Sequence, residues 1–528
     1  MIRAIKKFFG IGSDFRSGIK IVVNKEKLET RVALVENGML EEYTIERSDS
    51  DNVVGSIFKG KVRNLEPGLK AMFVDLGFEK NAFLHYWDAI PAALDEELEA
   101  IERGGKSLRK PKITSKDIPT IYPVGSEVMV QVTKGPIGNK GPRVTTNISL
   151  AGRYMVLMPR NDQFGISKKI EEPKERLRLR RIMERLSVPE GMGIILRTAA
   201  LGMKARYFVR DLAMLVEQWQ KVEENNAAMK SPARVFNEPD LVERTVRDFL
   251  TEEVDEVICD DQATTERMRT LAGQISRRSK RRIRLHTGGQ SIFDHFGVQK
   301  QIDNAFFRQV WLPCGGYLVI DETEAMIAVD VNTGRNKGSK DLDKTILQTN
   351  LEAAAEVARQ VRLRNIGGLI VVDFIDMKAE RDRKAVYKVM KDGLKRDKAK
   401  TQVLPISPFG LMEMTRQRLH ESLSTSIFDP CPYCHGTGRI KTPTSMSVEL
   451  QRKLHALLPT LPENQRDVLI VVHPEVMQRL RKEDAEHLME IERRHLCRLT
   501  FRADAAFHRE KIVIADAGSG TELVKSAA

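Results

Sequence analysis

The chain has 528 residues, enough for three or more domains, and 41% of them are hydrophobic, which suffices for several cores. Lys and Arg (86) outnumber Asp and Glu (73), so the net charge of +13 makes polyanions natural partners, although solvated basic faces would explain the same charge. Five cysteines do not make a disulfide framework in so long a chain. The sequence contains no run of about 20 uncharged apolar residues, which a membrane span would need, and its N-terminus lacks the apolar core of a signal peptide. We therefore expect a cytoplasmic protein.

The first part of the chain predicts β-structure. Residues 1–18 have a basic start and only a few apolar residues, and a frayed extension is favoured over a short amphipathic helix on a membrane surface. Residues 20–45 alternate apolar and polar side chains around Asn37-Gly38, which is typical of a β-hairpin.

A small β-barrel is predicted over residues 53–148, where five short strands are separated by Gly and Pro. A basic and aromatic surface on such a barrel fits the oligonucleotide-binding (OB) fold. The candidate RNA contacts are Phe73, Phe83 and Lys140, because bases stack on aromatic rings for about 1–3 kcal/mol each. By composition alone, a core position is the more common place for such a Phe. The Gly-, Pro- and Lys-rich segment 102–119 is expected to be a mobile basic loop.

The middle of the chain alternates predicted helices and strands. We expect a charged helix over 170–186, a buried strand within 191–200, a helix over 208–225 and a linker over 229–239. The dense basic run 276–286 fits a solvated face or a strip that contacts phosphates.

Two strongly apolar segments, 317–332 and 367–377, flank a predicted helix over 341–365. This layout predicts parallel neighbouring strands joined by a right-handed crossover. Equivalent strand ends would then meet at one edge of a sheet, which is where open α/β sheets place their ligands.

Three polar side chains are expected to converge at that edge: Asp330, Asn332 and Asp373. Asn332 lies two residues beyond Asp330 and therefore on the same face of a strand. Oxygen ligands without Cys or His suit Mg²⁺ better than zinc, and Mg²⁺ can activate water and neutralise a phosphate. Asp376 would face the other way, and Asp321 is a weaker candidate. The alternative is that these carboxylates only cap strands.

Cys431 and Cys434 form half of a metal site in the sequence CPYC. Structural zinc needs four ligands, and the cysteines at 259, 314 and 497 are isolated in sequence. The simplest completion is the same pair from a second chain, which predicts a dimer that shares one zinc. A redox motif is the alternative, but the flanking residues do not resemble a helix N-terminus.

Four blocks of sequence closely resemble the bacterial ribonuclease E/G family: VDVNTGR around 330–335, NLEAAAEVARQVRLRNIGGLIVVDFIDM (350–377), SPFGLMEMTRQR (407–418) and CPYCHGTG (431–438). The similarity extends from about Lys20 to the end of a small C-terminal α/β domain. It implies a Mg²⁺-dependent endoribonuclease that cuts single-stranded, A/U-rich RNA to 5′-monophosphate and 3′-hydroxyl products, in rRNA and tRNA processing and in mRNA decay.

The resemblance also implies roles for single residues. Asp330 and Asp373 match ligands of one catalytic Mg²⁺ per chain, with Asn332 as their partner, and Cys431 and Cys434 match a zinc link between chains. The remaining matches are RNA contacts in an S1-type domain (Phe73, Phe83, Lys140) and a pocket that senses a 5′-monophosphate (Arg197, Thr198, Gly152, Val156). An Arg side chain can bind phosphate oxygens with two parallel hydrogen bonds, which suits Arg197 to this role. Without the resemblance, an arginine that packs against a helix would be the favoured interpretation of Arg197.

The implied fold is multidomain α/β with an inserted all-β barrel. Its parts are an RNase H-like subdomain in two pieces (1–51 and 243–306), an S1-type OB-fold domain (52–146), a 5′-sensor region (147–242), a DNase I-like catalytic subdomain (307–428), a zinc link (429–440) and a small domain (441–528). Zinc-linked homodimers would pair into a homotetramer. The long tail of the E-type enzymes is missing, so a G-type or tail-less E-type enzyme is expected, and RNA-decay proteins are candidate partners.

Two other functions compete with this interpretation. A non-catalytic RNA-binding or ribosome-assembly factor on the same scaffold would predict loss of Asp330 or Asp373, and both are present. A metal-dependent phosphoesterase that acts on DNA or small phosphates is disfavoured by the predicted barrel and the basic strips.

Overall fold

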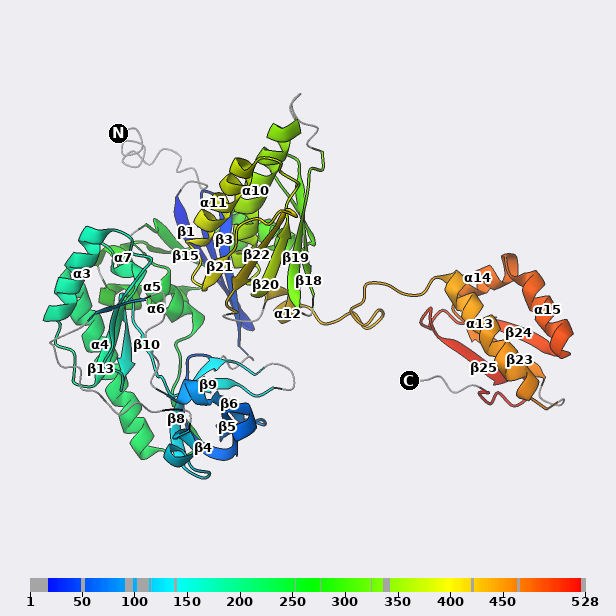
Figure 1. The fold of residues 1–528 in the computed structure, drawn as a ribbon, viewed down its shortest axis with the longest axis horizontal. Coiled ribbons are helices and arrows are strands. Elements are labelled where there is room, and N and C mark those ends of the chain that lie inside the picture. Colours follow the sequence, from blue (N-terminus) through cyan, green and yellow to red (C-terminus); the bar gives the residue numbers. More distant parts are fainter. Residues whose placement is uncertain are drawn as a thin grey trace. The chain divides into compact units, whose positions relative to one another are not determined.

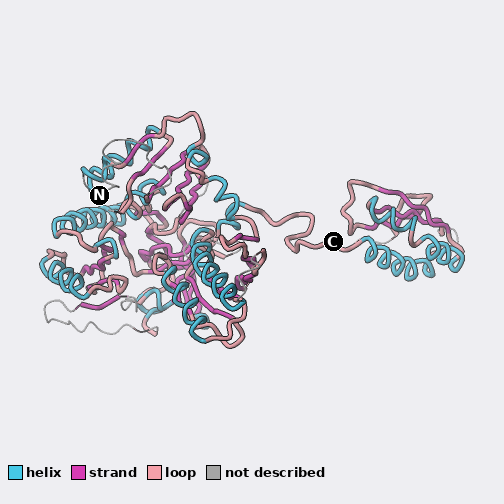
Figure 2. Tube along the Cα trace, turned by 90° about the horizontal axis from the view of Figure 1, so that it is seen from above, coloured by secondary structure: helices cyan, strands magenta, loops and turns pink. Residues whose placement is uncertain are grey.

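The computed structural model describes residues 18–523, apart from 49–52, 91–97, 102–113, 115, 137–139, 252, 276, 324, 336–341, 419–421 and 463–465. The expectations for the N-terminal extension and for most of the basic loop lie outside these residues. The chain divides after Ser426 into two compact units, each of which mixes helices and strands (Figures 1 and 2). Of the helices in the described part, none combines the length and apolarity that a bilayer crossing requires.

The first sheet joins segments far apart in the sequence, in the order β16-β15-β1-β2-β3. Its strands are β1 (Ile19–Lys25), β2 (Glu29–Glu36), β3 (Met39–Arg47), β15 (Glu256–Cys259) and β16 (Ile283–Leu285). Asn37 and Gly38 both have positive φ (51° and 84°), as a tight hairpin turn requires, so the predicted hairpin is confirmed. The flanking helices are α5 (Leu241–Asp248), α6 (Gln262–Ile275) and α7 (Arg277–Arg281), then α8 (Ile292–His295) and α9 (Gln299–Ala305).

Alternating side chains of β1 build two separate cores in this sheet. Ile21 and Val23 pack with residues of α5 and α6, whereas Val22 packs with residues of α8 and α9. The sheet is therefore covered on both faces, as expected for an α/β layer.

The predicted barrel is present. Its strands are β4 (Ile57–Glu66), β5 (Ala71–Asp75), β6 (Ala82–His85), β8 (Glu127–Lys134) and β9 (Arg143–Thr145), with the short helices η1 (Pro67–Leu69), η2 (Tyr86–Ala89) and α2 (Ile118–Ile121). Pairing of β4 with β8 closes the sheet. The prediction of a linker over 229–239 was wrong in its centre, because β14 (Ala233–Phe236) adds to the edge of this sheet beside β4.

A third sheet has the order β10-β11-β13-β12-β7. Its elements are β7 (Leu98–Ile101), β10 (Leu150–Ala151), β11 (Met155–Pro159), β12 (Phe164–Ser167), β13 (Met192–Leu196), α3 (Pro173–Arg185), η3 (Thr198–Ala200) and α4 (Ala205–Ala228). Phe208 and Trp219 of α4 are fully buried against it. The helices predicted over 170–186 and 208–225 are confirmed.

The fourth sheet carries the two candidate aspartates and has the order β17-β18-β19-β20-β22-β21. Its elements are β17 (Gln309–Trp311), β18 (Tyr317–Glu322), β19 (Met326–Asn332), α10 (Leu342–Leu363), β20 (Gly368–Asp373), α11 (Glu380–Leu394), β21 (Thr401–Val403), β22 (Leu411–Arg416) and α12 (Leu423–Ile427). As predicted, β19 and β20 are parallel and α10 connects them. The segment 317–332 is not one strand but an antiparallel hairpin.

One face of this sheet is covered and the other is open. Ile327, Val329 and Val331 of β19 are buried in a core that also contains residues of α10 and α11, which lie side by side in Figure 1. The alternate residues of the strand, Ala328 and Asp330, are exposed. The open face is therefore accessible to a large substrate.

The second unit is a small α/β domain, as predicted. It contains α13 (Pro443–Leu457), η4 (Leu458–Thr460), β23 (Asp467–Val472), α14 (Pro474–Lys482), α15 (Ala485–His495), β24 (Arg498–Ala503) and β25 (Ile512–Asp516). The central strand β23 pairs parallel with β24 and antiparallel with β25.

Candidate catalytic site and RNA contacts

Asp330 and Asp373 lie directly beside each other. They are paired in register across the parallel strands β19 and β20, and Asp373 is the last residue of β20. The amide Nδ2 of Asn332 donates a hydrogen bond of 2.8 Å to Oδ2 of Asp330. The structure thus brings together the three residues that the sequence places at this edge.

The charges of this site favour a cation. Burial raises the pKa of Asp373, and the carboxylates of Asp330 and Asp376 raise it further. Neighbouring carboxylates repel each other, and a bound cation relieves that repulsion. Asp321, the weaker candidate, is instead paired with Arg308.

The donor set fits Mg²⁺. Two carboxylates and an amide offer only hard oxygen ligands at the metal, and Mg²⁺ typically takes one or two carboxylates and keeps several waters. Within the described ranges, no three His, Cys, Asp or Glu side chains are grouped so that they could hold a metal ion. Asp330 and Asp373 would therefore hold Mg²⁺ together with water and the substrate.

The turn after Asp373 is held by a residue that the sequence analysis did not single out. Asn350 of α10 is 0% exposed; its Nδ2 donates to the carbonyl of Ile375 (2.7 Å), and its Oδ1 accepts from the backbone N–H of Ile375 (3.2 Å). Both backbone groups of Ile375 are thereby satisfied by one side chain. A polar residue within the apolar stripe of a helix was the only signal for this role.

A buried ion pair supports the other end of β20. Arg416 of β22 is paired with Asp397 through two hydrogen bonds of 2.6 and 3.0 Å, and the two side chains are only 4% and 2% exposed. Arg416 also donates to the carbonyl of Ile366, just before β20 (2.6 Å). Because the pair is bidentate and buried, it fixes where β20 begins.

The two barrel phenylalanines form one outward-facing aromatic pair. Phe73 of β5 and Phe83 of β6 are directly opposite each other, with ring centroids 5.9 Å apart, and the ring of His85 lies 6.4 Å from Phe83. Both Phe side chains are partly exposed and lie outside the barrel core, so the alternative of a core position is wrong for both. Lys140 is exposed, and its contact with RNA stays a prediction.

Arg197 and Gly152, two of the predicted sensor residues, are in contact. Nη1 of Arg197 donates to the carbonyl of Gly152 (2.5 Å) and to Oδ1 of Asp248 (2.8 Å). Thr198, which follows Arg197, is exposed, whereas Val156 is partly exposed on the neighbouring strand β11.

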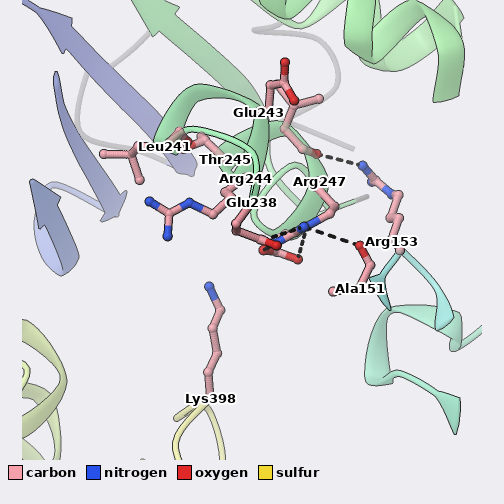
Figure 3. Close-up of polar contacts among 12 residues, drawn as sticks. Ala151, Arg153, Glu238, Leu241, Glu243, Arg244, Thr245, Arg247 and Lys398 are labelled. Carbon is pink, nitrogen blue, oxygen red and sulfur yellow. Dashed lines mark hydrogen bonds and ion pairs between the residues drawn. The ribbon is translucent and has the colours of Figure 1, made fainter. Parts of the chain in front are cut away.

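A network of arginines anchors this region to α5 (Figure 3). Arg247 donates to the carbonyl of Ala151 (3.3 Å) and to the carboxylates of Glu238 and Asp248 (both 3.0 Å), while Arg153 donates to a backbone carbonyl of α5. Burial alone would raise the pKa of Asp248, but its two arginine partners outweigh burial and hold the pKa below its ordinary value. Asp248 was missed from the sequence because it is 51 residues from Arg197.

The CPYC segment presents thiols that accept backbone hydrogen bonds. The N–H of Gly438 donates to Sγ of Cys434 (3.3 Å), and the N–H groups of Cys434 and Tyr433 lower the pKa of Cys431. Such donors stabilise thiolates, which are the form that binds zinc. By contrast, burial raises the pKa of Cys259 to about 11.

Known proteins that resemble this chain in sequence belong to one family. A profile of the Ribonuclease E/G family matches residues 149–419, which include the aspartate pair and the sensor residues. Ribonuclease G of Escherichia coli (strain K12) is 38% identical over 473 residues, or 90% of this chain and 94% of that protein. The chain belongs to the ribonuclease E/G family.

Other members of the ribonuclease E/G family show similar identity. Ribonuclease G of Haemophilus influenzae is 36% identical over 471 residues, 89% of this chain and 94% of that protein. Ribonuclease E of Escherichia coli is 37% identical over 468 residues, 88% of this chain but only 43% of that protein. A profile named "RNase E/G, Thioredoxin-like domain" matches residues 430–517, which include both CPYC cysteines. The expected class, a ribonuclease, is thus confirmed at the level of the family.

Proposed function

We propose that this protein is a Mg²⁺-dependent endoribonuclease that hydrolyses phosphodiester bonds of single-stranded RNA. The observation that carries the proposal is the in-register pair of Asp330 and Asp373, with Asn332 hydrogen-bonded to Asp330. When bound, Mg²⁺ supplies an activated water and neutralises charge on the phosphate. Asp330 and Asp373 hold the ion through their carboxylates, and Asn332 keeps the Asp330 carboxylate oriented. The products are a 5′-monophosphate and a 3′-hydroxyl.

Single-strand specificity is supported by the barrel. Aromatic side chains bind bases by stacking, which requires bases that are not already stacked in a duplex. Phe73 and Phe83 offer such a surface, and Lys140 supplies a positive charge for the backbone. A preference for A/U-rich segments is proposed from family membership.

A preference for 5′-monophosphorylated RNA is supported by the position of Arg197. The hydrogen bonds from its guanidinium to Gly152 and Asp248 both leave from Nη1, and a guanidinium carries five N–H donors, so a phosphate can share the same side chain. Thr198, Gly152 and Val156 would line the remaining wall. A Cβ at Gly152 would lie 2.7 Å from the carboxylate of Asp211, so a larger residue there would displace the Asp211 side chain.

The proposed assembly is a homodimer that shares one zinc through Cys431 and Cys434, with two dimers paired into a tetramer. This arrangement is supported by the two cysteines, which are half of a four-ligand zinc site, and by the backbone N–H groups that donate to their sulfur atoms. We further propose RNase H-like, S1-type and DNase I-like identities for the first, second and fourth sheets. Processing of rRNA and tRNA and decay of mRNA in the cytoplasm are the proposed roles.

The function is tested by cleavage of a single-stranded, A/U-containing RNA with Mg²⁺. Asp330→Asn and Asp373→Asn should each abolish cleavage while RNA binding survives. Asp321→Asn is the matched control, because Asp321 lies on the same sheet but pairs with Arg308, and it should cleave normally. RNA binding without cleavage by the unchanged protein would instead support the non-catalytic RNA-binding factor.

A further inference from the structure

An exposed aromatic pair lies at the edge of the catalytic sheet. Trp311 of β17 is 55% exposed and stands directly opposite Tyr317 of β18, with ring centroids 5.3 Å apart. Tyr317 in turn stands opposite Asn332 of β19. Directly paired residues share a face of a sheet, so Trp311 and Tyr317 lie on the same open face as Asn332 and Asp330.

A cation lies close to Trp311. The guanidinium of Arg335 lies 5.6 Å from the ring centroid of Trp311. Arg335 follows Asn332 by three residues, and its backbone N–H donates to the carbonyl of Gly315 (2.9 Å). Gly334 has a φ of 55°, and a Cβ there would lie 2.6 Å from the Gly315 carbonyl, so the turn that presents Arg335 is tightly packed.

We propose that Trp311, Tyr317 and Arg335 form a base-stacking platform that positions a nucleotide of the RNA substrate beside the scissile bond. This inference rests on the proposed function. Neighbouring strands lie about 4.8 Å apart, so two strand spacings put the backbone of Trp311 roughly 10 Å from that of Asn332. A base within two nucleotides of the cut lies within that reach. The aromatic faces stack on the base, and the guanidinium contacts its phosphate.

The local charges favour RNA over an apolar partner. The platform combines an exposed cation with aromatic rings and adjoins the carboxylates that would bind the metal, which is the composition of a surface for nucleic acid. A cross-strand aromatic pair also stabilises a sheet edge without any ligand, and a second copy of the chain is another occupant. The test below distinguishes the platform from a purely structural aromatic pair and from an interface with a second copy.

The test compares Trp311→Ala with two other variants. Trp311→Phe keeps an aromatic face, and Phe307→Ala removes an aromatic side chain that is 60% exposed and lies just before β17. We expect Trp311→Ala to lower kcat/KM on single-stranded RNA by roughly 5- to 150-fold, which corresponds to the loss of one stacked base. Trp311→Phe should retain most of the activity, and Phe307→Ala should match the unchanged protein. Equal activity of Trp311→Ala and Phe307→Ala would overturn the inference.

Abasic substrates identify the stacked base. An abasic site moved through the positions next to the cut should slow the unchanged protein at one position and leave Trp311→Ala unaffected there. An equal effect of the abasic site on both proteins would also overturn the platform. If Trp311→Ala lowers the mass in solution, the pair is an interface between copies and the inference fails.

A binding measurement separates this inference from the proposed catalysis. The chain has three tryptophans, and Trp219 is 1% exposed, so in a Trp87→Phe, Asp373→Asn protein the fluorescence change on RNA binding reports Trp311. Quenching by uncleaved single-stranded RNA is the expected result, and unchanged emission at saturating RNA contradicts the platform. Cleavage by Asp373→Asn would contradict the proposed function instead.

Discussion

Replacing Asn350 by Ala should damage both the stability and the activity of the protein. The change removes two hydrogen bonds to the backbone of Ile375, two residues after Asp373. At about 0.5–1.5 kcal/mol for each bond, the free energy of unfolding should fall by roughly 1–3 kcal/mol. The turn would also shift, and a displacement near 1 Å at a catalytic site can lower kcat by about 100-fold.

The assay pairs urea unfolding with cleavage kinetics. Gln348→Ala is the matched control, since Gln348 is exposed on the same helix and donates to the exposed side of that helix, at Glu352. That variant should change the free energy of unfolding by less than about 0.5 kcal/mol and leave kcat unchanged. The reasoning is refuted if Asn350→Ala unfolds and cleaves like Gln348→Ala.

The remaining predictions concern ion pairs and thiols. Arg416→Ala should lower the free energy of unfolding by roughly 3–5 kcal/mol, because Asp397 would be left buried without its partner; a loss below about 1 kcal/mol in urea unfolding would contradict this. Asp248→Asn should flatten the dependence of the free energy of unfolding on acid pH. Because the pKa of Asp248 is lowered in the folded protein, the carboxylate stabilises the fold fully above the ordinary carboxyl pKa of about 3.9, and this stabilisation is lost as pH falls through the lower folded pKa. Identical acid-unfolding curves for the variant and the unchanged protein would refute that role. Joint replacement of Cys431 and Cys434 by Ala should release zinc and reduce the mass in solution, and light scattering that shows an unchanged mass would exclude the shared site.

Local sequence patterns predicted much of the fold. The hairpin of β2 and β3 follows from the alternation of apolar and polar residues and from Asn37-Gly38, which tolerates positive φ. The adjacency of Asp330 and Asp373 follows because strands joined by one helical crossover tend to be parallel neighbours in a sheet. These rules act within a few tens of residues.

Long-range pairing was beyond the same rules. β14 has only four residues, and its partner β4 lies about 170 residues earlier, so its segment was predicted as a linker. The split of 317–332 was missed because the turn at Thr323 contains neither Gly nor Pro, although the Thr323 hydroxyl donates to the carbonyl of Met326 (2.6 Å). Asn350 and Asp248 have partners that are distant in sequence, so their contacts could not be predicted, although Asn350 is visible as a polar residue in the apolar stripe of its helix.

The central claim is that Asp330 and Asp373 together hold one catalytic Mg²⁺ in each chain. Titration with Mn²⁺ as a spectroscopic substitute, followed by electron paramagnetic resonance, tests it most directly. We expect one tightly bound ion per chain that is lost in Asp373→Asn and retained in Asp321→Asn, with RNA cleavage following the same order. Full Mn²⁺ binding and normal cleavage by Asp373→Asn would contradict the account.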